Sequence, residues 1–578
     1  VVSDPYSGYV ATHAPDLHMW RPVFCDGQLV CFVGNHIHNT DVGGAVPASL
    51  SRTLTEVHQE GLRIPPMRLM RDGKMNEDLL AMIDTNVRLP EQNRGDLLAQ
   101  IACTEVGARK VQDIVARFGV EGFRNGLDEL LNYAERQARA IISDLPDGEY
   151  FFSDYADEDQ TGGYPVRMCV TLRVKGDTLE VDYTGSDPQL VSSLNMPTGG
   201  NPRHSLVMVG VVYALYCIDP TVMLNYGLVR PVRAILPEGT VVNATKPAAV
   251  GMRSLLSNLA QTTIFGAFAR IVPDLMPASP GNGLTILNVR TSTRDGRMVM
   301  ASIGPVGGGA GGGPAADGAE GCGANMSYLK NTPVEINEAE VPIDILRYGL
   351  VPDSGGPGRW RGGSALEMEF RLDAPQSMVT ARNRDRSRFA SWGLSGGLPG
   401  AHSTFTRNPD GPAPEELGVI DIVPCEPGDV IRLRGPGAGG YGDPLGRPLE
   451  DVMTDIRRGF ISAGHAAAYY GVILDEAGAV DPAASAAERA RIVADRPATE
   501  TGFCANRIAF EAVWTPARYG ALTRILAALP INWRYFVKHA IFREIGTALP
   551  NSATDISAVE AAFAALRQRF PDLPEVAR

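Results

Sequence analysis

Histidine and aspartate side chains are concentrated near the start of the chain. Five of the nine histidines lie within the first 58 residues, and the stretches THAPDLH (12–18) and NHIHNTDVGG (35–44) also carry aspartates. An HxxD pair occurs in each stretch, His13 with Asp16 and His38 with Asp41. Imidazole nitrogen and carboxylate oxygen together suit Zn, Mn or Fe(II), and three protein ligands leave positions open for substrate or water. We therefore interpret His13, Asp16 and His38 as candidate metal ligands and as candidate catalytic residues.

Other polar residues of these stretches have less direct roles. Asp41 is expected as a fourth ligand or as an acceptor that orients a histidine, and it joins the candidate catalytic residues. Strand alternation places His36 on the same face as His38, so His36, and more weakly His18, stay open as further ligands. The glycine pair at 43–44 lets the main chain pass close to a bound group. The alternative interpretation is that these histidines only cap turns in polar loops.

A hairpin is expected between the two histidine stretches. In VFCDGQLVCFVG (23–34) two apolar runs flank Asp26-Gly27, a dipeptide typical of two-residue turns. Because an antiparallel pair returns the chain on itself, His13 and His38 are expected to become neighbours.

Hydrophobic periodicity predicts the elements that follow. They are helices at 96–118 (capped by Asp96), 122–144, 203–218 and 254–271, a hairpin at 166–185, short strands from about 285 to 440, and helices from 448 onward. We expect an α+β, multi-domain fold with a helix-rich N-terminal metal-binding part, a β-rich central part and a helical C-terminal extension. The expected regions are 1–150, 151–280, 281–446 and 447–578.

Length and composition limit the class of protein. A chain of 578 residues exceeds one compact core, and 44% hydrophobic residues argue against disorder. A net charge of −13 argues against nucleic-acid binding, which needs a basic face. Eight scattered cysteines without CxxC argue against a cysteine zinc cage and favour a reducing, cytoplasmic setting. The longest apolar run, 205–218, is too short to span a bilayer, so no membrane contact is expected.

Two glycine-rich stretches have part of the pattern of a phosphate-binding loop. Residues 304–323 lack GK[ST] and precede no clear helix, so a flexible lid, a backbone-lined pocket or an ordinary loop is expected there. GAGGYG (437–442) fits GxGxxG, but Asp443-Pro444 follows in place of a helix, and we interpret it as a tight turn. The charged run RNRDRSR (382–388) is interpreted as a solvated face, with an anion or subunit contact as the alternative.

Several longer stretches together resemble the HyuB-type family, which comprises the B subunits of ATP-dependent hydantoinases, the equivalent half of 5-oxoprolinase, a caprolactamase subunit and subunits of acetone and acetophenone carboxylases. The matching stretches are SDPYSGYVATHAPD (3–16), HNTDVGGAVPAS (38–49), TEVHQEGLRIPP (55–66), NRGDLLAQIA (93–102), NTPVE (331–335), PDSGGPGRWRGG (352–363), WGLSGGLPG (392–400) and GDVIRLRGPGAGGYGDPL (428–445). The resemblance covers about residues 1–475 and leaves the region after about 480 unmatched.

The resemblance implies a ligand set and a partner. The family's HxxD pair and later histidine map onto His13, Asp16 and His38, in agreement with the interpretation of the residues on their own. ATP and Mg are implied to bind a separate HyuA-type subunit within a hetero-oligomer, with further small subunits possible in it. A carboxylate from sequence that precedes SDPY is implied as another ligand in family members.

The resemblance leaves two reactions open. Hydantoinase-type members have the sequence HHAD where this chain has His38-Asn39-Thr40-Asp41. The sequence of residues 34–49 is more similar to the acetophenone carboxylase type. We therefore expect the metal-binding subunit of an ATP-dependent ketone carboxylase that uses bicarbonate. An ATP-dependent cyclic amide hydrolase is the alternative, and a scaffold subunit with a degenerate metal site is a third. The segment NWRYFVKHAIF (532–542), rich in aromatic and basic residues, is a candidate dock for the partner, unless it folds back on its own domain.

Overall fold

The computed structural model describes residues 1–578 apart from 9, 160–161, 323–330, 421, 496–501 and 577–578. The chain forms two compact units, each assembled from two separate segments: unit 1 comprises Val1–Glu149 and Thr171–Ser257, and unit 2 comprises Tyr150–Val170 and Asn258–Arg578. Helices and sheets are mixed, which confirms the α+β, multi-domain class with its β-rich centre and helical C-terminal part. The four regions expected from the sequence stay a prediction about domain boundaries.

Unit 1 begins with a long antiparallel hairpin. Strands β1 (Asp16–Cys25) and β2 (Gln28–His38) are joined by Asp26 and Gly27, whose φ angles of 50° and 73° match a two-residue turn. The register places Asp16 opposite His38. The hairpin expected at 23–34 is therefore confirmed, and its strands extend far enough to bring two candidate ligands face to face.

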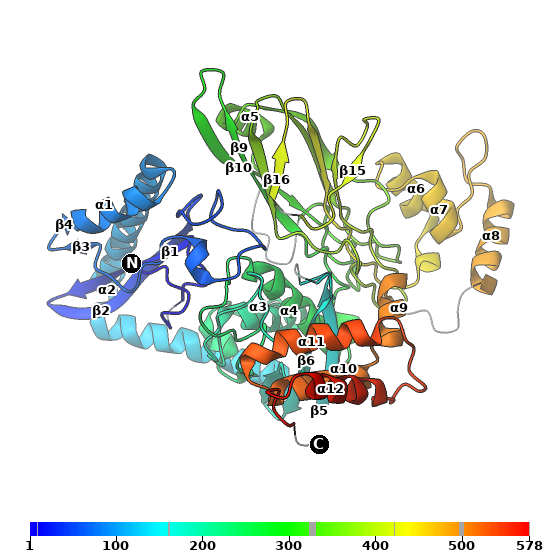
Figure 1. The fold of residues 1–578 in the computed structure, drawn as a ribbon, viewed down its shortest axis with the longest axis horizontal. Coiled ribbons are helices and arrows are strands. Elements are labelled where there is room, and N and C mark those ends of the chain that lie inside the picture. The colour runs from blue at the N-terminus through cyan, green and yellow to red at the C-terminus, as the bar shows by residue number, and fades with distance from the viewer. Residues whose placement is uncertain (9, 160–161, 323–330, 421, 496–501, 577–578) are drawn as a thin grey trace. The chain divides into compact units, whose positions relative to one another are not determined.

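A 54-residue helix, α2 (Pro90–Ser143), packs along this hairpin (Figure 1). It contains both helices expected at 96–118 and 122–144, and the helical geometry is interrupted at Gly119 (φ 74°, ψ 165°). The expected cap at Asp96 is wrong, because the helix already begins at Pro90, a residue suited to a first helical position.

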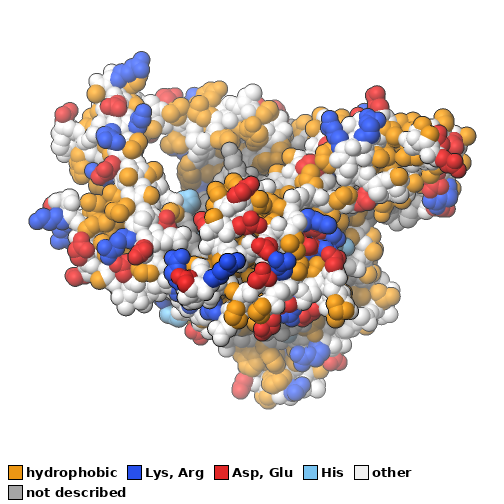
Figure 2. Space-filling view, turned by 90° about the horizontal axis from the view of Figure 1, so that it is seen from above, with side chains coloured by type: hydrophobic (Ala, Val, Ile, Leu, Met, Phe, Trp, Pro, Cys, Tyr) orange, Lys and Arg blue, Asp and Glu red, His pale blue; other side chains and the backbone are white. Residues whose placement is uncertain are grey.

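The apolar stripe expected on α2 is only partly buried. Leu97 and Val115 are buried, whereas Leu98 and Phe118 are 56% and 58% exposed. Hydrophobic side chains also lie at the surface between interspersed basic and acidic ones in Figure 2. Periodic spacing thus identifies one face of a helix, but it does not determine whether another element covers that face.

Unit 1 contains further short strands and helices besides the β1–β2 hairpin and α2. They are η1 (Val57–Glu60), β3 (Met70–Arg71), β4 (Lys74–Met75), α1 (Glu77–Asn86), β7 (Thr178–Asp182), α3 (Ser205–Ile218), η2 (Tyr226–Val229) and β8 (Val232–Ile235). Strands β5 (Gly148–Ala156) and β6 (Val166–Lys175) and helix α4 (Arg253–Phe268) have residues in both units. β7 pairs antiparallel with β6 and parallel with β8. The hairpin expected at 166–185 and the helices expected at 203–218 and 254–271 are confirmed.

Two antiparallel sheets share one hydrophobic core in unit 2. Their strand orders are β10-β9-β13-β16 and β11-β12-β17-β14-β15. The strands are β9 (Leu284–Ser292), β10 (Met298–Gly307), β11 (Ile343–Leu350), β12 (Leu366–Leu372), β13 (Ser377–Arg382), β14 (Thr404–Arg407), β15 (Glu415–Glu416), β16 (Ile422–Cys425) and β17 (Val430–Arg434). Alternate residues point inward, among them Leu287 and Val289 of β9 and Met368 and Phe370 of β12, so the two inner faces form a common core.

Main chain packs directly against main chain in the glycine-rich stretches of unit 2. A Cβ at Gly437 would lie 1.6 Å from the Ser354 carbonyl oxygen, and one at Gly309 would lie 2.0 Å from that of Gly363. Main-chain hydrogen bonds join these segments, for example from the Gly312 amide to the Gly439 oxygen, 2.9 Å. Residues 308–312 of the stretch 304–323 are therefore packed main chain, whereas residues 314–317 are exposed. GAGGYG belongs to the same packing and not to a tight turn, and only the short η4 (Pro444–Gly446) follows it.

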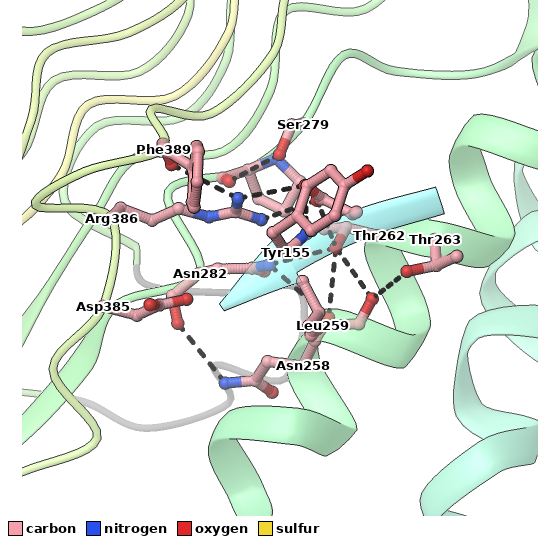
Figure 3. Close-up of polar contacts among 12 residues, drawn as sticks. Tyr155, Asn258, Leu259, Thr262, Thr263, Ser279, Asn282, Asp385, Arg386 and Phe389 are labelled. Carbon is pink, nitrogen blue, oxygen red and sulfur yellow. Dashed lines mark hydrogen bonds and ion pairs between the residues drawn. The ribbon is translucent and has the colours of Figure 1, made fainter. Parts of the chain in front are cut away.

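The charged run at 382–388 is interior, so its interpretation as a solvated face is wrong. Arg386 is 0% exposed, and its guanidinium lies 2.8 Å from the Asp154 carboxylate, which also pairs with Arg507 at 3.1 Å. Figure 3 shows Arg386 extending inward toward the strand that carries Tyr155. A buried charge needs a partner and hydrogen bonds, and the Asp154 carboxylate supplies them here.

Helices make up the rest of unit 2. They are η3 (Pro273–Leu275), α5 (Val334–Glu340), α6 (Leu449–Arg457), α7 (Ala463–Tyr470), α8 (Pro482–Asp495), α9 (Ala505–Val513), α10 (Pro516–Ala528), α11 (Ile531–Ile545) and α12 (Ser557–Arg569). Helices α10, α11 and α12 stack together, as the orange and red ribbons of Figure 1 show. Within the described residues no helix combines the length and the apolar character needed to cross a membrane.

The segment expected as a partner dock contributes to this helical core. Val537, Ile541 and Phe542 of α11 are buried together with Tyr155 and Phe389 of the same unit. The alternative, a helix folded back on its own domain, is therefore the observed arrangement. The aromatic residues that suggested an interface are mostly used inside unit 2.

We predict that Gly437→Ala destabilises the fold. The added methyl group meets main chain, which cannot rotate away, so we expect a loss of about 1–3 kcal/mol of unfolding free energy or more. Gly349→Ala in β11 is the matched control, because a Cβ there meets nothing within 4 Å. Thermal and urea unfolding of both variants measures the difference, and equal unfolding midpoints would contradict the packing argument.

Candidate metal centre

His13, Asp16 and His38 converge in unit 1. One ligand atom from each lies within 4.8 Å of the others, and the two imidazole centroids are 4.9 Å apart. His13 lies in the loop before β1, Asp16 begins β1 and His38 ends β2. His13 and Asp16 are buried whereas His38 is exposed, so the group opens on the side of His38. His13 and His38, which the hairpin was expected to bring together, are thus neighbours.

The buried donors of this group fit a divalent cation. The Nε2 of His13 lies 3.0 Å from an Asp16 carboxylate oxygen. The contact lacks hydrogen-bond geometry, and within the described structure this buried nitrogen has no hydrogen-bond partner. Buried polar atoms are rarely left without a partner, so a nitrogen and an oxygen facing a common point match the donor set of Zn, Mn or Fe.

The other nitrogen of His13 determines the tautomer. Its Nδ1 lies 3.0 Å from the main-chain oxygen of Gly251, which accepts a proton and cannot donate one. The proton therefore resides on Nδ1, and Nε2 keeps its lone pair. Burial lowers the pKa of His13, and the nearby Arg253 lowers it further, so the ring favours the neutral form that a ligand needs.

Arg253, the first residue of α4, forms an ion pair with Asp16. Its Nη2 lies 2.6 Å from Asp16 Oδ2, and its Nε donates to Thr12 at 2.8 Å. Burial opposes ionisation of Asp16, but the guanidinium of Arg253 lowers the pKa of this carboxyl. Sequence reasoning missed Arg253, because a single arginine 237 residues after Asp16 carries no spacing signal.

The remaining sequence candidates lie close by but outside this group. His18 and His36 face each other across the hairpin with stacked rings 5.1 Å apart, two residue pairs along the ladder from Asp16 and His38. Burial lowers the pKa of His18 to about 4. These two histidines are absent from the convergent ligand set of the described residues.

Asp41 supports the loop that follows His38. Its carboxylate is buried and accepts hydrogen bonds from the amides of Gly43, Ala48 and Arg88 at 2.9–3.1 Å, and from the Arg88 guanidinium at 2.7 Å. A carboxylate with these partners fixes the loop between 41 and 48. The structure therefore places Asp41 in a different environment from the three converging ligands.

The fold and this site together define the class of protein. The model of the hydantoinase B/oxoprolinase family matches residues 1–444, and the chain belongs to this family. The putative B subunit of a D-/L-hydantoinase from Pseudomonas sp. (strain NS671) is 31% identical over 83% of this chain and 81% of its own length. The beta subunit of caprolactamase from Pseudomonas jessenii is 32% identical, with 84% of each chain covered.

Solved structures show the same fold. The crystal structure of the ATP-dependent caprolactamase from Pseudomonas jessenii superposes with a TM-score of 0.77 at 31% identity and covers 85% of each chain. The nucleotide-free structure of acetone carboxylase superposes with a TM-score of 0.78 at 19% identity and covers 100% of this chain and 83% of that one. The fold of the C-terminal helical part, unmatched at the level of sequence, thus has a counterpart in a solved structure.

We predict that His38→Ala removes bound divalent metal while leaving the fold largely intact. His38 is exposed and lies at the end of a strand, so its loss costs little packing but deletes one of three ligands. His36→Ala, two residues earlier on the same strand, is the control and is expected to keep the metal. Elemental analysis of the purified variants, with circular dichroism for folding, makes the comparison. Full metal content in His38→Ala would disprove the assignment.

Proposed function

We propose that this chain is the metal-binding subunit of an ATP-dependent carboxylase that acts on a ketone with bicarbonate, and that a HyuA-type partner subunit supplies the ATP site. The observation that carries the proposal is the convergence of His13 Nε2, Asp16 and His38 within a fold of the hydantoinase B/oxoprolinase family.

Each residue of the site has a definable task in this proposal. His13, Asp16 and His38 would hold the ion, and the exposed side of His38 leaves an approach for the substrate. A bound divalent ion supplies Lewis acidity, which stabilises negative charge on a carbonyl-derived oxygen. Arg253 keeps Asp16 ionised and oriented, and the Gly251 oxygen keeps His13 in the required tautomer.

The extent of the fold favours the carboxylase. The likeness to acetone carboxylase extends over the whole chain, including the C-terminal helices, whereas the likeness to caprolactamase covers 85% of it. Two stretches, 304–323 and 437–442, partly match a phosphate-binding loop, and their glycines at 308–312 and 437–440 make close contacts with main chain. This supports an ATP site on a separate polypeptide, and so does the fact that the hydantoinase and caprolactamase relatives are themselves single subunits of larger enzymes.

Cyclic amide hydrolysis is the second candidate function. It is favoured by the 31–32% identity to a hydantoinase subunit and to a caprolactamase subunit, over most of each chain. In amide hydrolysis ATP would phosphorylate the amide oxygen, which leaves as phosphate after water adds to the carbonyl carbon. In carboxylation ATP would activate the ketone as an enol phosphate or bicarbonate as carboxyphosphate, and phosphate is released when the carbon–carbon bond forms, with the ketone oxygen retained. The two reactions also differ in the substrate, a ketone with bicarbonate in one and a cyclic amide with water in the other.

We predict that the chain, purified with its partner subunit, hydrolyses ATP in the presence of an acetophenone-like ketone and bicarbonate. Incorporation of labelled bicarbonate into an acid-stable product, measured beside ATP turnover, identifies carboxylation. A parallel assay with hydantoins and lactams tests the second candidate.

Two controls make this assay decisive. The chain alone is expected to hydrolyse no ATP, and the complex with His38→Ala is expected to lose product formation. ATP turnover with cyclic amides and none with ketones would replace the first candidate by the second. Turnover that is unaffected by His38→Ala would remove the metal centre from the reaction.

A further inference from the structure

Glu60 is a fully buried glutamate near the metal centre that touches none of its ligands. It ends η1 with 0% exposure, and its Oε1 accepts hydrogen bonds from the amides of Val250 (2.7 Å) and Gly251 (2.6 Å). Its Oε2 is buried and has no hydrogen-bond partner among the described residues. Leaving a buried carboxylate oxygen unpaired costs stability, so an arrangement of this kind calls for another explanation.

The main chain that Glu60 holds reaches both buried ligands. The amide of Gly251 donates to Glu60, and the carbonyl of the same residue accepts the Nδ1 proton of His13 at 3.0 Å. Two residues later, Arg253 contacts Asp16 at 2.6 Å. A displacement of residues 250–253 would therefore move the partners of His13 and Asp16 together.

The close approach of Glu60 depends on glycine at position 251. A Cβ there would lie 3.0 Å from Glu60 Oε1 and 2.8 Å from Leu50 Cδ2. A larger residue would press on the ends of these two side chains, so Leu50 or the Glu60 carboxylate would have to shift. Residues 60 and 251 thus fit one another sterically as well as by hydrogen bonds.

Glu60 is also anchored to the loop that follows His38. The amide of Ala45 donates to the Gln59 oxygen at 2.9 Å, and the amide of Leu62 donates to the Val42 oxygen at 2.8 Å. A Cβ at Gly44 would lie 2.5 Å from the Gln59 oxygen, so the two segments are in direct contact. Glu60 therefore links the loop after the third ligand to the segment that orients the first two.

We infer that Glu60 is a positioning residue of the metal centre: its Oε1 fixes Val250 and Gly251, so that the Gly251 carbonyl holds the Nδ1 proton of His13 and leaves Nε2 available for the ion. The inference rests on the metal centre proposed above and adds to it a residue that acts through Gly251. The site requires from Glu60 an acceptor oxygen on a side chain long enough to reach the amides of Val250 and Gly251, and it does not require the negative charge.

Two conservative variants separate the effect of the Glu60 side-chain length from the effect of its charge. Glu60→Gln keeps an oxygen at the same length without the charge, which the site tolerates because burial already raises the pKa of Glu60 to about 7. Glu60→Asp keeps the charge but withdraws the oxygens by one methylene group from the amides of Val250 and Gly251. We expect Glu60→Asp to weaken metal binding by about 10-fold or more, the usual size of an effect transmitted through a ligand's hydrogen-bond partner, and Glu60→Gln to stay within about 3-fold of the parent.

The measurement uses the full chain after chelator treatment. Zn²⁺ affinity is obtained by competition with a chromophoric chelator, and the visible spectrum of the Co²⁺-loaded protein reports the ligand geometry. Glu367→Gln is the matched control for lost stability, because Glu367 is also a buried glutamate but pairs with arginines of the β-sheets in unit 2. It is expected to lower the unfolding midpoint and to leave the Zn²⁺ affinity and the Co²⁺ spectrum unchanged.

Each outcome has a distinct meaning. Loss of affinity in Glu60→Asp with retention in Glu60→Gln supports the inference. Parent-like affinity in Glu60→Asp, or an equal loss in both variants, overturns it while leaving the metal centre in place. Failure of the parent chain to bind Zn²⁺ or Co²⁺ overturns the metal centre itself, and the inference with it.

Discussion

The antiparallel register of β1 and β2 is the constraint on which the candidate site depends. It places Asp16 opposite His38, and the loop just before β1 then brings His13 to the same point. Because side chains alternate along a strand, a slip of one residue would turn His38 to the other face of the hairpin. The register shifts by one residue between Val23 and Phe24, so the two-residue turn at Asp26-Gly27 and this irregularity together set the pairing of Asp16 with His38.

Electrostatic balance keeps this group in a form that can bind a cation. Burial would favour the neutral forms of both His13 and Asp16, but the guanidinium of Arg253 holds Asp16 ionised while burial keeps His13 neutral. Arg253, which is distant in the sequence, contributes to both effects. The hairpin thus supplies the ligands, and the start of α4 sets their protonation.

In unit 2, close packing of glycine segments takes the place of side-chain packing. Glycine segments cross so closely that main-chain atoms occupy the space of side chains, and hydrogen bonds between them replace a regular sheet. Nearby, Arg386 and Arg507 share the buried carboxylate of Asp154. Low-complexity and strongly charged stretches, which usually indicate surface loops, here form interior structure, because glycine main chain is hydrogen-bonded to main chain and the buried guanidinium groups pair with a carboxylate.

The sequence by itself determined the hairpin, most helices, the α+β class and the three converging residues, because spacing, turn dipeptides and periodicity are local properties of the chain. It misjudged the cap at Asp96 and the charged run around Arg386, and it left two roles open for the aromatic segment of α11, since burial depends on what covers a residue. Only the tertiary structure revealed Arg253, Gly251 and Glu60 beside the ligands and the separate environment of Asp41. Contacts across some 190 to 240 residues leave no periodic trace in a sequence, and folding alone brings such residues together.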